Sequence, residues 1–219
     1  VMFSDAGPDV RWIGNEHGVV GDPNWSTVDP TVVPFPGVVG EGVREMLQHG
    51  DPHGTVWRPG ESDVSIRPGW FHHPSEDDSV KTVDELVQLF FTSVGRNSKL
   101  LLNVPPTKDG VLHPTDVKRL RGMREHLDAQ FAMDRFPAVD AGGTETISLA
   151  DLREDIARGQ TVSRYRLEGL VGDDWRVLSR GTTIGYRRLD QFEAVNVSAV
   201  RLTIEDAIDE PGPVDVALY

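Results

Sequence analysis

The spacing of the apolar residues changes once along this chain, near residues 135–145, and this change limits the folds available to it. Before that point, the run KLLLNV at 99–104 is apolar without interruption. Such a run is typical of a strand buried on both faces, as in parallel sheets. Beyond that point, apolar and polar residues alternate, which is typical of antiparallel strands with one exposed face. We therefore expect an α/β first part and an all-β second part.

Two helical patterns flank the apolar run. Thr82 and Glu85 match a capping box, and the apolar spacing that follows predicts an amphipathic helix over 83–95. Pro114 opens a second helical pattern that continues to about Phe131. The repeated order of strand, loop and helix is the pattern of an α/β domain over residues 1–135.

The second part is expected to form a small antiparallel β-sandwich over residues 145–219. The segments VSRYRLEG, AVRLTIE and VDVALY alternate in polarity, and Gly- and Pro-containing turns separate them. FPAVDAGGTE, just before them, is rich in Pro, Gly and small residues and is interpreted as a linker. A short helical piece is expected at about 148–157.

Composition narrows the possible partners. The chain has 35 Asp+Glu against 22 Lys+Arg and a formal net charge of -13, so it repels phosphate backbones and we expect no nucleic-acid partner. No apolar run is long enough to cross a bilayer, so no membrane partner is expected either. The chain has no cysteine, which excludes disulfides and thiol catalysis and leaves the cellular compartment open. The oligomeric state is also open.

No cofactor or metal site is expected from the motifs. Nucleotide-binding glycine patterns and the serine-hydrolase elbow are absent. His72 and His73 are adjacent, and His49 and His53 have helical spacing, but Pro52 interrupts a helix through the second pair. No HExxH motif or aspartate-rich calcium loop is present, so we predict no metal site.

Four of the five tryptophans lie within the first seventy residues, in segments rich in Gly and Pro: Trp12, Trp25, Trp57 and Trp70. Loop tryptophans near acids suit carbohydrate binding, because the ring face stacks on the apolar face of a sugar. The alternative is that these rings plug the ends of a barrel. The same segments carry the candidate acids Asp5, Asp9, Glu16, Glu41, Glu61, Asp63, Glu76, Asp77 and Asp78.

Glu16 is the strongest candidate acid. It lies in RWIGNEHG (11–18), between Gly14 and Gly18, which permit tight turns near a ligand. Trp12 could desolvate Glu16 and so adapt it to act as a general acid, as one of the two carboxyl groups that glycoside hydrolysis needs. The alternative interpretation is a polar turn. Glu61, in PGESD, could likewise belong to a solvated turn.

Three long motifs carry a family resemblance: FSDAGPDVRWIGNE, WRPGESDVSIRPGWFHH and SVGRNSKLLLNVPPTKDG. They resemble the second half of the catalytic domain of family 29 glycoside hydrolases, the α-L-fucosidases. They look closer to the branch that acts on α-1,3/1,4-linked fucose. The resemblance covers residues 1 to about 130, and the tail resembles the β-sandwich that follows the barrel. It implies the C-terminal half of a (β/α)8 barrel followed by an antiparallel β-sandwich.

The resemblance also implies roles for single residues. The enzymes it points to are retaining and use an aspartate nucleophile with a glutamate acid/base, which falls on Glu16. The partner would be a fucosylated oligosaccharide. The remaining expected substrate-binding residues are Arg11, Trp12, Asn15, Glu61, Trp70 and His72. His72 stands where the resemblance leads us to expect a tyrosine.

One part of the resemblance has no counterpart in these residues. The nucleophile lies in a WFD-like segment upstream of the acid/base, and the chain has no such segment. We therefore interpret the chain as the later part of an exo-α-L-fucosidase that is inactive alone, because the covalent step needs a second carboxylate. The competing hypothesis is a non-catalytic carbohydrate-binding protein with a degenerate barrel. For the sandwich, bracing the barrel is favoured over sugar binding.

Overall fold

The first unit of the chain is built on a four-stranded parallel sheet. The computed structural model describes residues 1–219. The strand order is β1-β2-β5-β6, and all three neighbouring pairs are parallel. The strands are β1 (Phe3–Ser4), β2 (Val10–Trp12), β5 (Gly60–Ser65) and β6 (Ser98–Asn103). A small antiparallel pair, β3 (Thr27–Val28) and β4 (Val56–Trp57), lies in the connection between β2 and β5.

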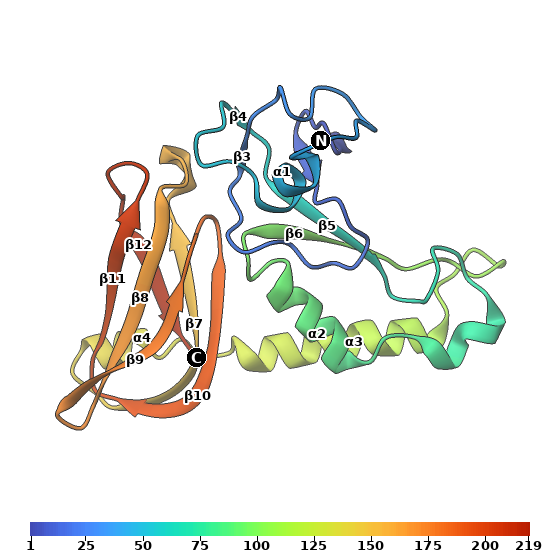
Figure 1. Ribbon diagram of the computed structural model, residues 1–219. Helices are drawn as coiled ribbons and strands as arrows, with labels where there is room; N and C mark the ends of the chain where they lie inside the picture. Colours follow the sequence, from blue (N-terminus) through green and yellow to red (C-terminus); the bar gives the residue numbers. More distant parts are fainter.

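Two of the four helical segments in this unit run along one side of the sheet. The helices are α1 (Val43–His49), the 3-10 helix η1 (Pro74–Ser79), α2 (Val83–Thr92) and α3 (Pro114–Gln130). Figure 1 shows α2 and α3 running along one side of β5 and β6. The capping box at Thr82 is formed as expected, with Glu85 bonded back to the Thr82 backbone. No helix is long and apolar enough to cross a membrane.

The second unit is a sandwich of two three-stranded sheets. One has the order β10-β7-β12 and the other β11-β8-β9, and every pair is antiparallel. The strands are β7 (Glu145–Glu154), β8 (Val162–Val171), β9 (Asp174–Gly181), β10 (Arg188–Val197), β11 (Val200–Ala207) and β12 (Val214–Leu218). The core between the sheets includes Ile147, Leu152, Tyr165 and Leu167, all almost fully buried. This confirms the predicted fold class.

Two local expectations differ from the structure. The helical piece expected at 148–157 is the strand β7 through residue 154, followed by the short 3-10 helix η2 (Ile156–Arg158). The expected linker at 135–145 contains the helix α4 (Phe136–Asp140), whose Phe136 and Val139 pack into the sandwich core. We therefore propose that the boundary between the two units lies just before Phe136.

The two units pack tightly against each other. Val87 and Phe91 of α2 share a buried apolar cluster with Leu149 of β7 and Leu189 of β10. The backbone continues this contact, because Leu189 donates to the Gly95 carbonyl at 2.9 Å. In Figure 1 the sandwich lies at the end of the α3 helix, beside the β3–β4 pair. The sandwich therefore packs against the first unit and buries part of its surface.

Candidate active site

The candidate site occupies the face of the parallel sheet opposite its helices. The register aligns Trp12 with Glu61, and Asp63 with Leu101. Because alternate residues of a strand point to opposite faces, Glu61 and Asp63 share one face. Their neighbour Val64 points the other way and packs into the apolar core with Leu86 and Leu89 of α2. The helix-free face therefore carries acidic and aromatic side chains.

Glu16 lies in the loop that follows β2, at the carboxyl end of the parallel sheet. It is exposed, and its Oε2 accepts a hydrogen bond from Trp70 Nε1 at 3.1 Å. Trp70 belongs to the loop after β5, and its carbonyl accepts from Asn103 Nδ2 at 3.1 Å, at the end of β6. Residues from three neighbouring strand ends therefore meet around Glu16. In α/β sheets, ligands bind outside the carboxyl ends of the strands.

The indole N–H of Trp12 is hydrogen-bonded to Asp63 and not to Glu16. Its Nε1 donates to Asp63 Oδ1 at 2.6 Å. Burial raises the pKa of Asp63, and the nearby charges of Glu16 and Glu61 add to this rise, although the Trp12 bond opposes it. Asp63 stood among the candidate acids without a role. The signal that could have assigned one is its spacing of two residues from Glu61 in a predicted strand.

Glu61 is held by an ion pair inside the sheet. Its side chain is buried, and Lys99 Nζ of β6 lies 3.4 Å from its Oε2. The register explains this contact, because Glu61 and Lys99 are directly opposite in neighbouring strands. Lys99 was not singled out from the sequence. The helix-free face therefore carries Glu61 neutralised by a cation, and Asp63 without one.

Asn15 shapes the loop that presents Glu16. Its Oδ1 accepts from the His17 backbone N–H at 2.9 Å, and its Nδ2 donates to the Val19 carbonyl at 3.0 Å. Gly18 has φ 70°, and a Cβ there would come within 2.8 Å of Val64 Cγ1. The loop thus depends on glycine at residue 18 and on an asparagine side chain bonded within it.

Arg11, an expected substrate contact, points away from the site. Trp12 faces the helix-free side of β2, so its neighbour Arg11 must face the other side. Arg11 is 1% exposed, and its three guanidinium nitrogens donate to Leu47 O at 3.1 Å, Arg58 O at 2.6 Å and Asn24 Oδ1 at 2.6 Å. Burial lowers its pKa to about 9, which leaves it protonated at neutral pH. The structure does not bring Arg11 to the cleft.

Asn24 connects this buried arginine to the sandwich. Its Nδ2 donates to the carbonyls of Arg96 at 2.8 Å and Asn97 at 2.9 Å, and its backbone N–H donates to Thr183 Oγ1 at 3.0 Å. The residue is 1% exposed. Because Thr183 belongs to the sandwich, Asn24 fixes the segment that follows the Glu16 loop to both units.

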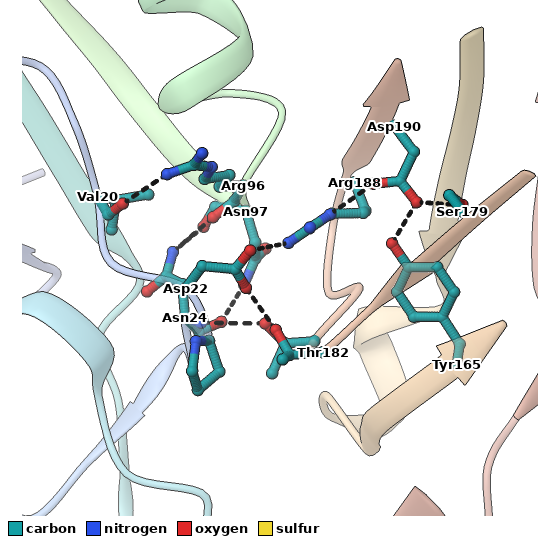
Figure 2. Close-up of polar contacts among 12 residues, drawn as sticks. Val20, Asp22, Asn24, Arg96, Asn97, Tyr165, Ser179, Thr182, Arg188 and Asp190 are labelled. Carbon is teal, nitrogen blue, oxygen red and sulfur yellow. Dashed lines mark hydrogen bonds and ion pairs between the residues drawn. The ribbon is translucent and has the colours of Figure 1, made fainter. Parts of the chain in front are cut away.

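A chain of charged contacts extends this connection into the sandwich, as Figure 2 shows. Asp22 accepts a hydrogen bond from Thr182 and lies 2.9 Å from Arg188 NH1. Arg188 also donates to Asp190 Oδ1 at 2.9 Å, and the other oxygen of Asp190 accepts from Tyr165 at 2.5 Å. Burial raises the pKa of the Tyr165 hydroxyl, so it stays a donor. The loop that carries Glu16 is thus anchored in the sandwich core.

His72 lies apart from Glu16. Its side chain is 9% exposed, and its Nε2 lies 3.4 Å from Asp77 Oδ1, beside His113. His72 and Trp70 are on the same loop, but the loop turns between them. The structure therefore brings Glu16, Trp12, Glu61 and Trp70 to one side of the sheet, with Asn15 supporting the loop, and places Arg11 and His72 elsewhere.

Comparisons with known proteins point to one family. A family model described as alpha-L-fucosidase matches residues 36–130. A curated protein of Oryza sativa subsp. japonica, whose name places it among the α-L-fucosidases, is 34% identical over 255 residues, covering 96% of this chain and 48% of that protein. Alpha-L-fucosidase 1 of Arabidopsis thaliana is 32% identical over 256 residues, covering 96% of this chain and 49% of that protein.

The solved structures agree with these relatives. A glycoside hydrolase 29 family member from an unknown rumen bacterium has a TM-score of 0.84 and 32% identity, covering 99% of this chain and 42% of that chain. The chain spans about half the length of the curated relatives it matches.

Proposed function

Because the chain belongs to the α-L-fucosidases of glycoside hydrolase family 29, we propose that it contributes the acid/base half of a retaining exo-α-L-fucosidase. The reaction releases terminal L-fucose from oligosaccharides or glycoconjugates. The single observation that carries this proposal is the position of Glu16. It is an exposed carboxylate at the carboxyl end of a parallel sheet, hydrogen-bonded to a tryptophan that can border a sugar.

In the proposed mechanism Glu16 acts twice. It first donates a proton to the departing glycosidic oxygen while a second carboxylate attacks the anomeric carbon of fucose. It then removes a proton from the water that hydrolyses the covalent fucosyl intermediate. An exposed loop position suits both steps, because the proton donor must reach first the leaving sugar and then solvent.

We place the nucleophile outside these 219 residues. A closed barrel of this class has about eight strands, whereas the parallel sheet here has four, with β1 and β6 as its edges. The WFD-like segment of the resemblance is also absent from the chain. In this account, a polypeptide of the relatives' full length completes both the barrel and the carboxylate pair.

The remaining residues around Glu16 are proposed to bind the sugar. Trp12 and Trp70 offer ring faces for the apolar side of fucose or its neighbour. Glu61 and Asp63 are positioned to accept hydrogen bonds from sugar hydroxyls, and Asn15 supports the loop. Arg11 is assigned an anchoring role, since each of its three guanidinium nitrogens donates a hydrogen bond within the protein. We propose α-1,3/1,4-linked fucose as the substrate, on the resemblance of the three sequence motifs.

Fucose release tests this function. We would assay free fucose from a Lewis-type trisaccharide and from an α-1,2-fucosylated sugar, using the 219-residue chain and a family-length polypeptide that contains it. The account predicts release by the longer polypeptide only, with the Lewis-type substrate preferred. Binding of either sugar without release by the longer polypeptide would favour the non-catalytic binding protein. Release by the 219-residue chain would mean that the nucleophile lies within it, with Asp63 as the first candidate.

A further inference from the structure

A cluster of two histidines and an aspartate lies outside the candidate site. His72 follows β5, Asp77 belongs to η1, and His113 precedes α3. Each residue offers one ligand atom, and these atoms all lie within 4.8 Å of one another. His72 and Asp77 belong to one segment after β5, whereas His113 comes from the segment before α3, so the fold brings His113 to the other two.

The spacing in this cluster suits a shared ion better than hydrogen bonds. His72 Nε2 is 3.4 Å from Asp77 Oδ1, and His113 Nε2 is 3.5 Å from Asp77 Oδ2. Hydrogen bonds of this type are normally about 2.7–3.2 Å long. Two ligand atoms that each lie about 2.05 Å from a tetrahedral ion are separated by about 3.3 Å. The two imidazoles therefore flank the carboxylate, one beside each oxygen, and the three ligand atoms lie within 4.8 Å of one another.

His72 also has a buried nitrogen without a partner. Its side chain is more than nine-tenths buried, and its Nε2, which faces Asp77, makes no hydrogen bond. Asp77 Oδ1 makes no hydrogen bond of ordinary geometry, although Arg67 NH1 lies 2.9 Å away and forms an ion pair with it. Buried polar atoms are rarely left in this state unless something unseen satisfies them, such as an ion.

The neighbouring arginine does not occupy the cluster. Arg67 donates two hydrogen bonds of 2.9 Å to Asp116, which is fully buried, and its third nitrogen lies 2.9 Å from Asp77 Oδ1. Asp116 already balances the charge of Arg67, so the charge of Asp77 is available to a further cation.

We propose that His72, Asp77 and His113 form a binding site for one divalent transition-metal ion, with Zn²⁺ as the best fit. Two imidazoles and one carboxylate are typical ligands of Zn²⁺, whereas Mg²⁺ and Ca²⁺ prefer oxygen alone. Asp77 and His113 are about one quarter to one third exposed, so water can complete the coordination. The proposal replaces the expectation of no metal, which considered only histidines close in sequence.

Metal binding here would tie together two loops. The ion would join the loop of Trp70 to the start of α3, and so hold the residue that contacts Glu16. Binding has a local cost at His113, whose Nδ1 accepts a long 3.4 Å bond from the Thr115 backbone. A neutral imidazole that binds the metal through Nε2 carries its proton on Nδ1, so this weak capping bond is exchanged for coordination.

Metal titration of the tag-free 219-residue chain tests the proposal, independently of any glycosidase activity. Co²⁺ would serve as the visible-absorption probe, and Zn²⁺ as its competitor. We expect one equivalent of Co²⁺ to bind with d–d absorption that Zn²⁺ abolishes, and we expect Zn²⁺ to raise the Tm until a chelator is added.

Three variants locate the binding. His72→Phe and His113→Asn should each weaken Co²⁺ binding at least tenfold. Asparagine at 113 can still cap the helix. The control is His73→Phe, because His73 is exposed and outside the cluster. Circular dichroism would establish that each variant is folded. If His72→Phe does not fold, Co²⁺ binding by His113→Asn decides the test. The proposal is overturned if the unaltered chain binds no stoichiometric Co²⁺, or if only the His73 variant loses it.

Discussion

Replacing Asn24 with alanine should weaken the connection between the parallel-sheet unit and the sandwich. Its side chain accepts a hydrogen bond from Arg11 at 2.6 Å and donates to the carbonyls of Arg96 and Asn97 at 2.8 and 2.9 Å. The change removes almost no apolar surface but leaves three buried polar groups short of a partner. The loss of stability therefore comes almost entirely from lost hydrogen bonds.

The expected loss follows from these three bonds. A hydrogen bond to a charged group contributes about 1.5–3 kcal/mol, and a neutral one about 1 kcal/mol. Their sum predicts a loss of about 3.5–5 kcal/mol in the free energy of unfolding for Asn24→Ala. The Arg11 bond dominates, because Arg11 is 1% exposed and water cannot replace the missing acceptor without opening the structure.

Urea unfolding followed by tryptophan fluorescence measures this loss. Trp25 is adjacent to Asn24 and 4% exposed, so its emission reports on the region that loosens. With an m value of about 2.5 kcal/mol/M, the midpoint should fall by about 1–2 M. The matched control is Asn196→Ala in β10, whose side chain accepts only an exposed hydrogen bond from Thr146, so that stability should change by less than about 0.5 kcal/mol. Equal effects of the two variants would refute the argument that the Asn24 contacts hold the units together.

The remaining predictions concern charge and the site. Asp63→Asn should raise stability at neutral pH. Burial and neighbouring carboxylates raise the Asp63 pKa, so the ionised carboxylate destabilises the folded state. The contribution of Asp63 to the free energy of unfolding is therefore full below about pH 3.9 and is lost as pH rises through the folded-state pKa. Asp22→Asn should lower stability at neutral pH. Burial alone would raise the Asp22 pKa, but the Arg188 charge and the Thr182 bond outweigh it and lower the pKa. The contribution of Asp22 to the free energy of unfolding is therefore present above about pH 3.9 and is lost as pH falls through the folded-state pKa. Urea midpoints across pH 3–7 test both signs, and parallel curves for a variant and the unaltered chain would contradict the corresponding one. Trp70→Phe should lower kcat/KM for fucose release by a family-length polypeptide about ten- to a hundredfold, through loss of the bond to Glu16, whereas substitution of exposed Phe71 by leucine should not.

The helix starts and the strand at 98–103 were predictable because their signals are local. The capping box at Thr82 and the proline at 114 mark helix starts that the structure confirms. The run KLLLNV corresponds to β6 over 98–103, but the expectation of burial on both faces was wrong, because β6 is an edge strand with Lys99 and Leu101 exposed. Each pattern depends on residues that are close together in the sequence, so the helix or strand can be predicted without knowledge of tertiary contacts.

The strand β7 was not predictable in the same way. Its residues SLADLRE contain several good helix formers, which suggested a helix. In the fold, β7 lies between β10 and β12 and is buried over most of its length. Pairing on both sides and burial on both faces outweigh the small local preference for helix, which is why tertiary contacts decide such segments.

Within the site, the sequence places Glu16 and Asn15 in one loop motif. Arg11 was expected to contact the substrate, because the alternation with Trp12, which puts Arg11 on the opposite face of β2, was not applied. The contact between Glu16 and Trp70 spans 54 residues, and the meeting of His72 with His113 depends on how two loops fold. Such contacts depend on tertiary structure that a local pattern does not contain.

Chemical rescue is the measurement that best distinguishes Glu16 as the proposed acid/base of a retaining fucosidase from a residue without that role. We would replace Glu16 with alanine in the family-length polypeptide and measure fucose release from a Lewis-type trisaccharide and from an activated aryl fucoside, each with and without azide. The account predicts a loss of about 10²–10⁴-fold on the trisaccharide, whose leaving group needs a proton. On the activated substrate, it predicts that azide restores turnover and yields fucosyl azide of retained configuration. Unchanged release from the trisaccharide by Glu16→Ala would contradict the account.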